Sequence, residues 1–342
     1  MFKNELKINK QEKNANLESF EVFHEIDVAY SKSGLENNFD SFLYYEIPYL
    51  VFATKKKSLI SYNLNDFSIN TEIMMPHEDY ISNIRHYIKD NNIIYILSIS
   101  RNINEIKMWN FQDWECIFNL RKTDIIGNTF ASIYINKGNK DYILISNSND
   151  SEYIQLYDLK GNRILSLNNS QGNVLFLDYF YDNQNFKYYI IAGCHNSCKS
   201  FDLEENKLYH KYYDEEEINT DWHASLKINL NDNIVKLIDS CWKDDFIRIW
   251  DFHKGILLSK FKIGGINIKC ICHWDKNLYF IGNKDYSIKL VDIKNEKVIK
   301  TFNAHKDWVV TIRKIKIDNY GECLISQGLA KNEVIKIWKM KI

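Results

Sequence analysis

The sequence predicts an all-β protein assembled from repeated copies of one small antiparallel sheet. Seven short apolar stretches each end in an aromatic or branched residue followed by a small polar or charged one, and these endings recur roughly every 45 residues. A period of this length is typical of an array of small sheets around an axis and not of one large core. We therefore predict a seven-bladed β-propeller of four-stranded antiparallel blades. The recurring positions are Tyr62, Trp109, Tyr157, Phe201, Trp250, Val291 and Trp338.

The second repeat shows how one blade is expected to fold. Four apolar stretches, residues 81–88, 93–100, 105–111 and 114–120, alternate with polar segments rich in Asn and Asp. Such residues tolerate the left-handed backbone of tight turns. Four strands joined by short turns make one antiparallel blade, and alternation along the third strand leaves an apolar face to pack on the next blade.

The same period places the other blades in order along the chain. Blades two, five and seven rest on motif as well as spacing, whereas blades one, three and four are assigned mainly by the period. The expected blades are residues 39–74, 81–120, 129–168, 173–213, 222–262, 266–303 and 308–340.

The last repeat ends at its third strand, so its outer strand has to come from elsewhere. Residues 17–24 form a strand-like segment before blade one, with Phe20 and Val22 alternating against Ser19 and Glu21. We expect this segment to be the outer strand of blade seven, which closes the ring and removes an exposed edge. Residues 1–16 are polar and charged and are predicted to be a flexible tail.

Composition narrows the classes of partner. The chain has 342 residues, of which 45% are hydrophobic and 26% charged, and its formal net charge is −1. A near-neutral protein creates no general field that attracts nucleic acid or an anionic membrane. The arginines are scattered along the sequence, although bidentate recognition of phosphate and guanine relies on that side chain. We therefore expect neither a nucleic-acid nor a membrane partner.

Cellular location is predicted from the ends and the cysteines. The N-terminus carries no apolar stretch of signal-peptide length, and no segment approaches the roughly 18 apolar residues of a membrane helix. The seven cysteines lie scattered in strand-like segments, which fits reduced thiols better than a disulfide framework. These features predict a cytoplasmic protein, with the nucleus as the alternative.

The third-strand endings resemble those of the WD-repeat family of β-propellers. Trp250-Asp251 matches the dipeptide that names the family, and Trp109-Asn110 and Trp338-Lys339 match it in part. The resemblance extends from about residue 17 to residue 342. It implies a hydrogen-bonded tetrad in each complete blade: a histidine before the first strand, a hydroxyl on the second, an aspartate in the next turn and the third-strand tryptophan.

Three blades supply parts of this tetrad, and in the sequence none has all four members. Asn102 and Asn332 stand near the expected aspartate positions of blades two and seven, and blade five lacks the histidine. The resemblance assigns these structural roles to His77, Ser98 and Trp109 in blade two, to Ser240, Asp244 and Trp250 in blade five, and to His305, Ser326 and Trp338 in blade seven.

Catalytic and metal-binding interpretations are weaker than these structural ones. His223, Ser240 and Asp244 suggest a triad, but nothing marks a contact between nucleophile and base or an oxyanion site. Cys194 and Cys198 are only marginally spaced for zinc, and Cys270 and Cys272 are two apart on a strand, which favours small buried apolar residues. We predict no catalytic residue, no metal and no cofactor.

Four aromatic residues are the best candidates for partner binding. Tyr80, Trp222 and Trp308 precede the first strands of blades two, five and seven, and Trp242 lies in the turn before Asp244. The resemblance implies that these loops surround the channel mouth, where peptides dock, and large amphipathic rings are common interface hot spots. The alternative is that they pack against neighbouring blades.

Two charge runs are expected to be solvated turns. Residues 55–57 are all lysine and residues 214–217 are all acidic, and like-charge blocks usually only keep a surface hydrated. The alternative is that opposite charges on one rim orient an approaching partner.

Together these features predict a non-catalytic scaffold that binds other proteins or peptides, as a monomeric propeller within a larger intracellular hetero-complex. A first alternative is an enzyme with its site at the channel mouth, since a fold does not fix a function. A second is a phosphoinositide-binding propeller, which would present an arginine pair, and the sequence has no adjacent arginines.

Overall fold

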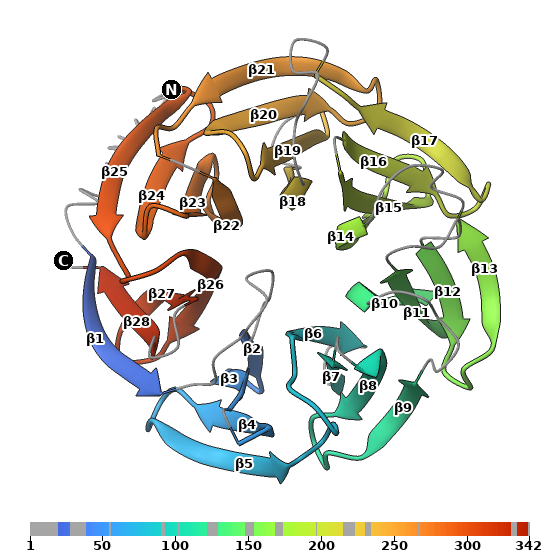
Figure 1. Ribbon diagram of the computed structural model, residues 1–342, viewed down its shortest axis with the longest axis vertical. Helices are drawn as coiled ribbons and strands as arrows, with labels where there is room; N and C mark the ends of the chain where they lie inside the picture. The colour runs from blue at the N-terminus through green and yellow to red at the C-terminus, as the bar shows by residue number, and fades with distance from the viewer. Residues whose placement is uncertain are drawn as a thin grey trace, which may run out of the picture.

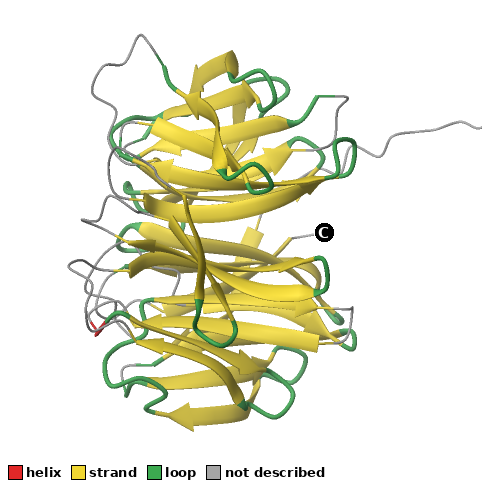
Figure 2. Cartoon of the chain, turned by 90° about the vertical axis from the view of Figure 1, so that its right-hand side faces the viewer, coloured by secondary structure: helices red, strands yellow, loops and turns green. Residues whose placement is uncertain are grey.

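The prediction of an all-β, seven-bladed propeller is confirmed by a computed structural model of the chain. In the described residues, 28 strands form seven four-stranded antiparallel sheets around a central axis (Figure 1). Seen from the side, the ring is a thick disc with turns on both faces (Figure 2). The structure describes residues 20–27, 39–54, 56–89, 93–100, 103–121, 129–147, 154–167, 174–195, 197–214, 223–229, 234–265, 267–329 and 334–340.

In every blade the first strand lines the channel, and in blades one to six the fourth lies at the rim (Figure 1). Blade one contains β2 (Phe39–Tyr44), β3 (Ile47–Ala53), β4 (Ser58–Asn63) and β5 (Ser68–Met74). Blade two contains β6 (Asn83–Lys89), β7 (Ile93–Ser100), β8 (Glu105–Asn110) and β9 (Cys116–Arg121). Blade three contains β10 (Thr129–Lys137), β11 (Lys140–Asn147), β12 (Ile154–Asp158) and β13 (Arg163–Leu167). Blade four contains β14 (Val174–Asp182), β15 (Lys187–Cys194), β16 (Ser197–Asp202) and β17 (Lys207–Tyr212).

The remaining three blades follow the same order. Blade five contains β18 (His223–Asn229), β19 (Lys236–Cys241), β20 (Phe246–Asp251) and β21 (Ile256–Lys262). Blade six contains β22 (Ile268–Asp275), β23 (Leu278–Asn283), β24 (Ser287–Asp292) and β25 (Lys297–Asn303). Blade seven contains β26 (Val309–Ile317), β27 (Gly321–Gly328), β28 (Val334–Met340) and, as its outer strand, β1 (Phe20–Asp27).

The apolar core is divided into seven layers, one between each pair of neighbouring blades. Each hydrophobic cluster draws its buried side chains from two adjacent sheets, and together the clusters complete the circle. Second and third strands are covered on both sides, which explains why β7 reads as a continuous apolar run, Ile93-Ile94-Tyr95-Ile96-Leu97. Outer strands such as β25 instead alternate between exposed and half-buried positions. Each blade is therefore stabilised by both of its neighbours.

Strand β1 closes the ring, as predicted. It pairs antiparallel with β28, from Phe20 opposite Met340 to Asp27 opposite Val334, with a register shift between Val22 and His24. The strand runs to Asp27 and so extends beyond the predicted end at residue 24. Leu17 and the predicted tail at residues 1–16 lie outside the described residues.

The register shift lets β1 contribute to both neighbouring core layers. Phe20 is buried against blade six, where its ring makes edge contacts with Trp274, Phe280 and Phe302 at centroid distances of 5.5, 5.2 and 5.7 Å. Ile26 is buried in the opposite layer, against blade one. One strand thus seals two interfaces.

No helix in the part of the chain that the structure describes has the length and apolar character needed to cross a membrane.

Deletion of residues 1–27 is expected to lower the melting temperature by roughly 10 °C, because it uncovers two core layers and the edge of β28. Differential scanning calorimetry measures the change. A chain lacking only residues 1–19 keeps β1 and serves as the control. Equal melting temperatures for the full chain and the 1–27 deletion would contradict the role of β1 in closure.

Candidate functional site

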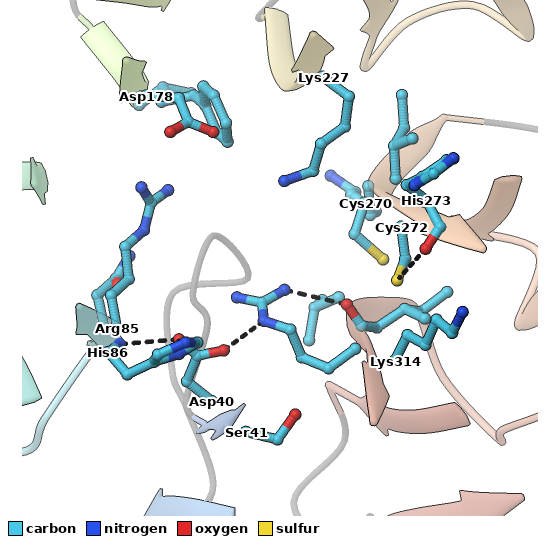
Figure 3. A pocket seen from close by; sticks show the side chains of 18 of the residues that line it. Asp40, Ser41, Arg85, His86, Asp178, Lys227, Cys270, Cys272, His273 and Lys314 are labelled. Carbon is cyan, nitrogen blue, oxygen red and sulfur yellow. Dashed lines mark hydrogen bonds and ion pairs between the residues drawn. The ribbon is translucent and has the colours of Figure 1, made fainter. Parts of the chain in front are cut away.

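The innermost strands enclose a cavity of about 510 Å³ on the axis of the ring. Its walls come from β2, β6, β14, β18, β22 and β26, with Trp242 from the β19–β20 turn (Figure 3). Five lining residues are lysine or arginine, and two are aspartate. The cavity is therefore rich in positive charge in a chain whose formal net charge is −1.

Two of the four predicted aromatic anchors lie beside one lysine of this cavity. The Lys269 Nζ is 3.5 Å from the ring centroid of Trp242 and 4.6 Å from that of Trp308. Lys284 approaches Trp308 as well, at 4.4 Å. Ammonium groups over indole faces are attracted by the ring quadrupole, which holds both indoles in fixed positions. The structure thus brings Trp242 and Trp308 together around Lys269.

The other two predicted anchors are placed differently. Tyr80 is 42% exposed and has its own cation, Lys57, whose Nζ lies 5.1 Å from the ring centroid. The Lys57 ammonium also donates to the Glu78 carbonyl and lies 3.7 Å from Asp79. Trp222 lies outside the described residues.

A buried carboxylate ties three blades together inside the channel. The Arg313 Nε donates to Asp40 Oδ1 at 2.6 Å, and the backbone N–H and ring Nδ1 of His86 donate to Asp40 Oδ2 at 2.9 and 2.8 Å. Burial alone would raise the pKa of Asp40, but the charge of Arg313 and the hydrogen bonds from His86 outweigh it and hold the pKa well below its ordinary value. These bonds link β26, β2 and β6 across the seam that β1 closes at the rim.

A second arginine spans a wider gap. Arg85 on β6 donates from Nη1 to the Leu177 carbonyl on β14 at 2.7 Å, and its Cζ lies 5.3 Å from the Phe176 ring centroid. Arg85 and Arg313 therefore line the same cavity although they are far apart in the chain. Two of the arginines that are scattered along the sequence thus lie around one cavity in the fold.

In blade two, the histidine, serine and tryptophan assigned by resemblance are connected. The His77 Nε2 accepts from Ser98 Oγ at 2.8 Å, and Trp109 Nε1 donates to the same oxygen at 2.9 Å. The carboxylate is Glu105, which accepts from His77 Nδ1 at 2.7 Å. Glu105 begins β8, whereas the resemblance implies an aspartate in the preceding turn, so the sequence pattern does not point to this residue. Blade two lacks that aspartate, and Glu105 contacts His77 from a different position.

In blade seven, His305, Ser326 and Trp338 are connected in the same way. The His305 Nε2 and the Trp338 Nε1 both lie 2.8 Å from Ser326 Oγ. Asn332 lies outside the described residues.

Blade five departs from the expected arrangement. The buried Trp250 indole N–H has no hydrogen-bond partner in the described ranges, so the bond to Ser240 is not made. Asp244 binds Arg248 instead, with Oδ2 accepting from Nη2 at 2.5 Å. Arg248 is fully buried on β20. An unpaired charge in the interior is strongly destabilising, so Asp244 pairs with Arg248 and does not join a tetrad.

The expectation that the acidic run is a solvated turn is wrong for Asp214, which is buried. It is 7% exposed, and its Oδ2 lies 3.2 Å from Arg248 Nε and 2.8 Å from Lys260 Nζ. The rest of that run, residues 215–217, lies outside the described residues.

The four cysteines considered for a metal are buried. Cys194 and Cys198 belong to different core layers, whereas Cys270 and Cys272 share one. Burial raises the pKa of Cys270 to about 12, so its thiol stays protonated at neutral pH. No group of three or more potential metal ligands occurs within the described ranges.

Comparison with known proteins gives one distant similarity. No family model matches the chain. A stretch of 109 residues, 32% of this chain, is 21% identical to the U3 small nucleolar RNA-associated protein 21 homolog of Schizosaccharomyces pombe. The matched stretch spans 12% of that protein, so the similarity concerns a small part of it.

Replacement of Asp40 by Asn is expected to destabilise the fold by about 3 kcal/mol, because Arg313 then lacks its carboxylate partner. Chemical denaturation measures the loss. The double variant Asp40→Asn with Arg313→Gln is the control, since removing both charges should restore part of the stability. Additive losses in the two single variants would contradict a coupled pair.

Acidification is expected to weaken the fold through His77. Burial lowers the pKa of His77 to about 4, although Glu105 opposes this shift. The unfolded chain therefore takes up a proton near pH 6.5 that the folded chain refuses until about pH 4, so stability is present above this window and is lost as the pH falls through it. The free energy of unfolding, measured from pH 7.5 to 4, should decline less steeply in His77→Gln. Parallel curves would refute this contribution.

Proposed function

We propose that this protein is a non-catalytic scaffold of the WD-repeat type that binds a protein or peptide at the channel mouth. The observation that carries the proposal is the cluster of Trp242, Lys269 and Trp308, which we call the mouth cluster. It draws on the blade-five turn, β22 and the loop before β26, so three blades fix its shape. Connected His–Ser–Trp groups in blades two and seven support the WD-repeat assignment.

The mouth cluster has the physical character of an interface anchor. Both indoles are half-buried, and the Trp242 N–H is buried without an acceptor in the described part of the chain. A partner that covers the exposed parts of these rings gains apolar burial. Since the blades hold the rings in place, little conformational entropy is lost on binding.

The channel groups support binding more than catalysis. The His86 imidazole is held by Asp40, and that carboxylate also neutralises Arg313, so the pair serves the seam of the ring. Burial raises the pKa values of Cys270 and Cys272, which leaves both thiols weak nucleophiles. We therefore propose that the chain has no chemistry of its own.

The distant relative supports a role within a larger assembly. Its name associates it with a U3 small nucleolar RNA, and such a protein works among other macromolecules. We propose that the present chain is likewise one subunit of an intracellular complex, cytoplasmic or nuclear, and that it contacts protein directly.

Single replacement of Trp242 or Trp308 by Ala is expected to reduce recovery of bound proteins about tenfold in affinity purification from the native organism, since hot-spot tryptophans carry much of an interface. Trp114→Ala, a tryptophan in the β8–β9 turn, is the matched control. Nuclease treatment before elution separates direct protein partners from those bridged by RNA. Undiminished recovery with both mouth variants would contradict the proposal.

A further inference from the structure

The channel below the mouth cluster is lined by cationic side chains, and Lys269 alone among them also belongs to the mouth cluster. Four cationic side chains enter it from four blades: Arg85 on β6, Lys227 on β18, Lys269 on β22 and Arg313 on β26. All four line the cavity. Figure 3 shows Arg85 and Lys227 directed into it from opposite walls of the ring's centre. Like charges that line one cavity repel one another, and an anion bound between them relieves this repulsion.

The two aspartates of the cavity do not balance this charge. Both oxygens of Asp40 are occupied, by Arg313 and by His86. Asp178 faces Arg85, and its Oδ1 accepts from the Tyr179 backbone N–H at 2.9 Å (Figure 3). In the described residues no carboxylate lies within ion-pair distance of the Lys227 ammonium. Lys227 therefore adds a positive charge that no carboxylate of the described residues balances.

The fifth cationic residue of the lining, Lys314, contributes little positive charge to the axis. Lys314 donates to the Trp274 carbonyl at 2.8 Å and lies 3.2 Å from Glu322 Oε2, so its ammonium is satisfied away from the axis.

Two uncharged donors in the same lining also lack acceptors. The Ser41 hydroxyl belongs to a residue that is 6% exposed, and its oxygen is buried with no hydrogen-bond partner in the described ranges. The buried Trp242 N–H is the second. Polar groups in such surroundings are normally paired, because an unmade hydrogen bond is costly. A ligand with several acceptor oxygens would satisfy both.

We propose that the channel binds a compact anion carrying several phosphate groups. Cations that converge from four blades suit a ligand with charge on all sides, and a cavity of about 510 Å³ has the size of a small-molecule site. Lys227 and Arg85 contact the phosphates, Lys269 holds the end near the mouth, and Ser41 donates a hydrogen bond. This ligand site is a separate proposal from protein binding by the indoles, although Lys269 belongs to both.

The test uses the full chain at low ionic strength, with calorimetric titration of inositol hexakisphosphate, inorganic triphosphate, orthophosphate and a polyglutamate peptide. Inositol hexakisphosphate or triphosphate should bind and should raise the melting temperature, because a ligand held by several blades stabilises the folded ring. Inositol hexakisphosphate carries its phosphates on a ring and triphosphate carries them in a line, so comparing the two shows which arrangement the site prefers. Binding of either compound supports the site.

Lys227→Gln should weaken binding of the multiphosphate about tenfold, since one charged contact is lost. Lys254→Gln is the matched control, because Lys254 lies in the β20–β21 turn with a side chain that is 69% exposed. Ser41→Ala, a smaller change, provides a second variant should Lys227→Gln fold poorly, and should also weaken binding.

Three results would overturn the proposal. They are no binding of either multiphosphate, an equal loss in Lys254→Gln, and binding of polyglutamate without binding of the phosphates. Loss of protein recovery in the tryptophan variants is a separate measurement, so the two proposals can fail independently.

Discussion

Pairing of β1 with β28 is the constraint on which the rest of the molecule depends. Every core layer lies between two blades, so an open ring would leave the outer faces of its first and last blades in water. The bulge after Val22 turns Phe20 towards blade six and Ile26 towards blade one, so one strand completes both layers. On the axis, Arg313, Asp40 and His86 bridge the same seam with charge-assisted hydrogen bonds. The ring is thus closed at its rim by apolar burial and at its centre by electrostatics.

This division of labour explains the character of the channel. Both oxygens of the Asp40 carboxylate accept hydrogen bonds from Arg313 and His86, so Asp40 cannot neutralise a further cation. Arg85 reaches past blade three to the Leu177 carbonyl, so it too supports the ring while keeping its positive charge. Closure thus places Arg313 on the axis, where Arg85, Lys227 and Lys269 line the same cavity although the chain as a whole is nearly neutral.

Much of the fold could be predicted from local periodicity, because each blade repeats one strand pattern and one ending. The His77–Ser98–Trp109 connection was implied by the resemblance to the WD-repeat family. The shared position of Arg85, Lys227 and Arg313 in one cavity could not be predicted from the sequence. These residues lie on different blades, and the arrangement of the blades around the ring, which places them together, is not contained in a linear pattern. Turn boundaries were blurred for another reason. Left-handed positions are occupied by Asn104 and Asn206 but also by Phe67 and Trp114, although the sequence pattern predicts a strand from residue 114.

The mouth cluster and the channel share Lys269, and this shared residue has a physical consequence. Its ammonium is held between two indoles, yet the side chain also lines the cavity. An anion on the axis attracts that ammonium inwards, away from the ring faces that a protein partner would cover. Any such displacement changes the affinity at the mouth, and thermodynamic reciprocity requires that binding at the mouth change the affinity of the channel by the same factor. A rigid ring favours this coupling. Because the closely packed blades do not shift, the movement is confined to the Lys269 side chain.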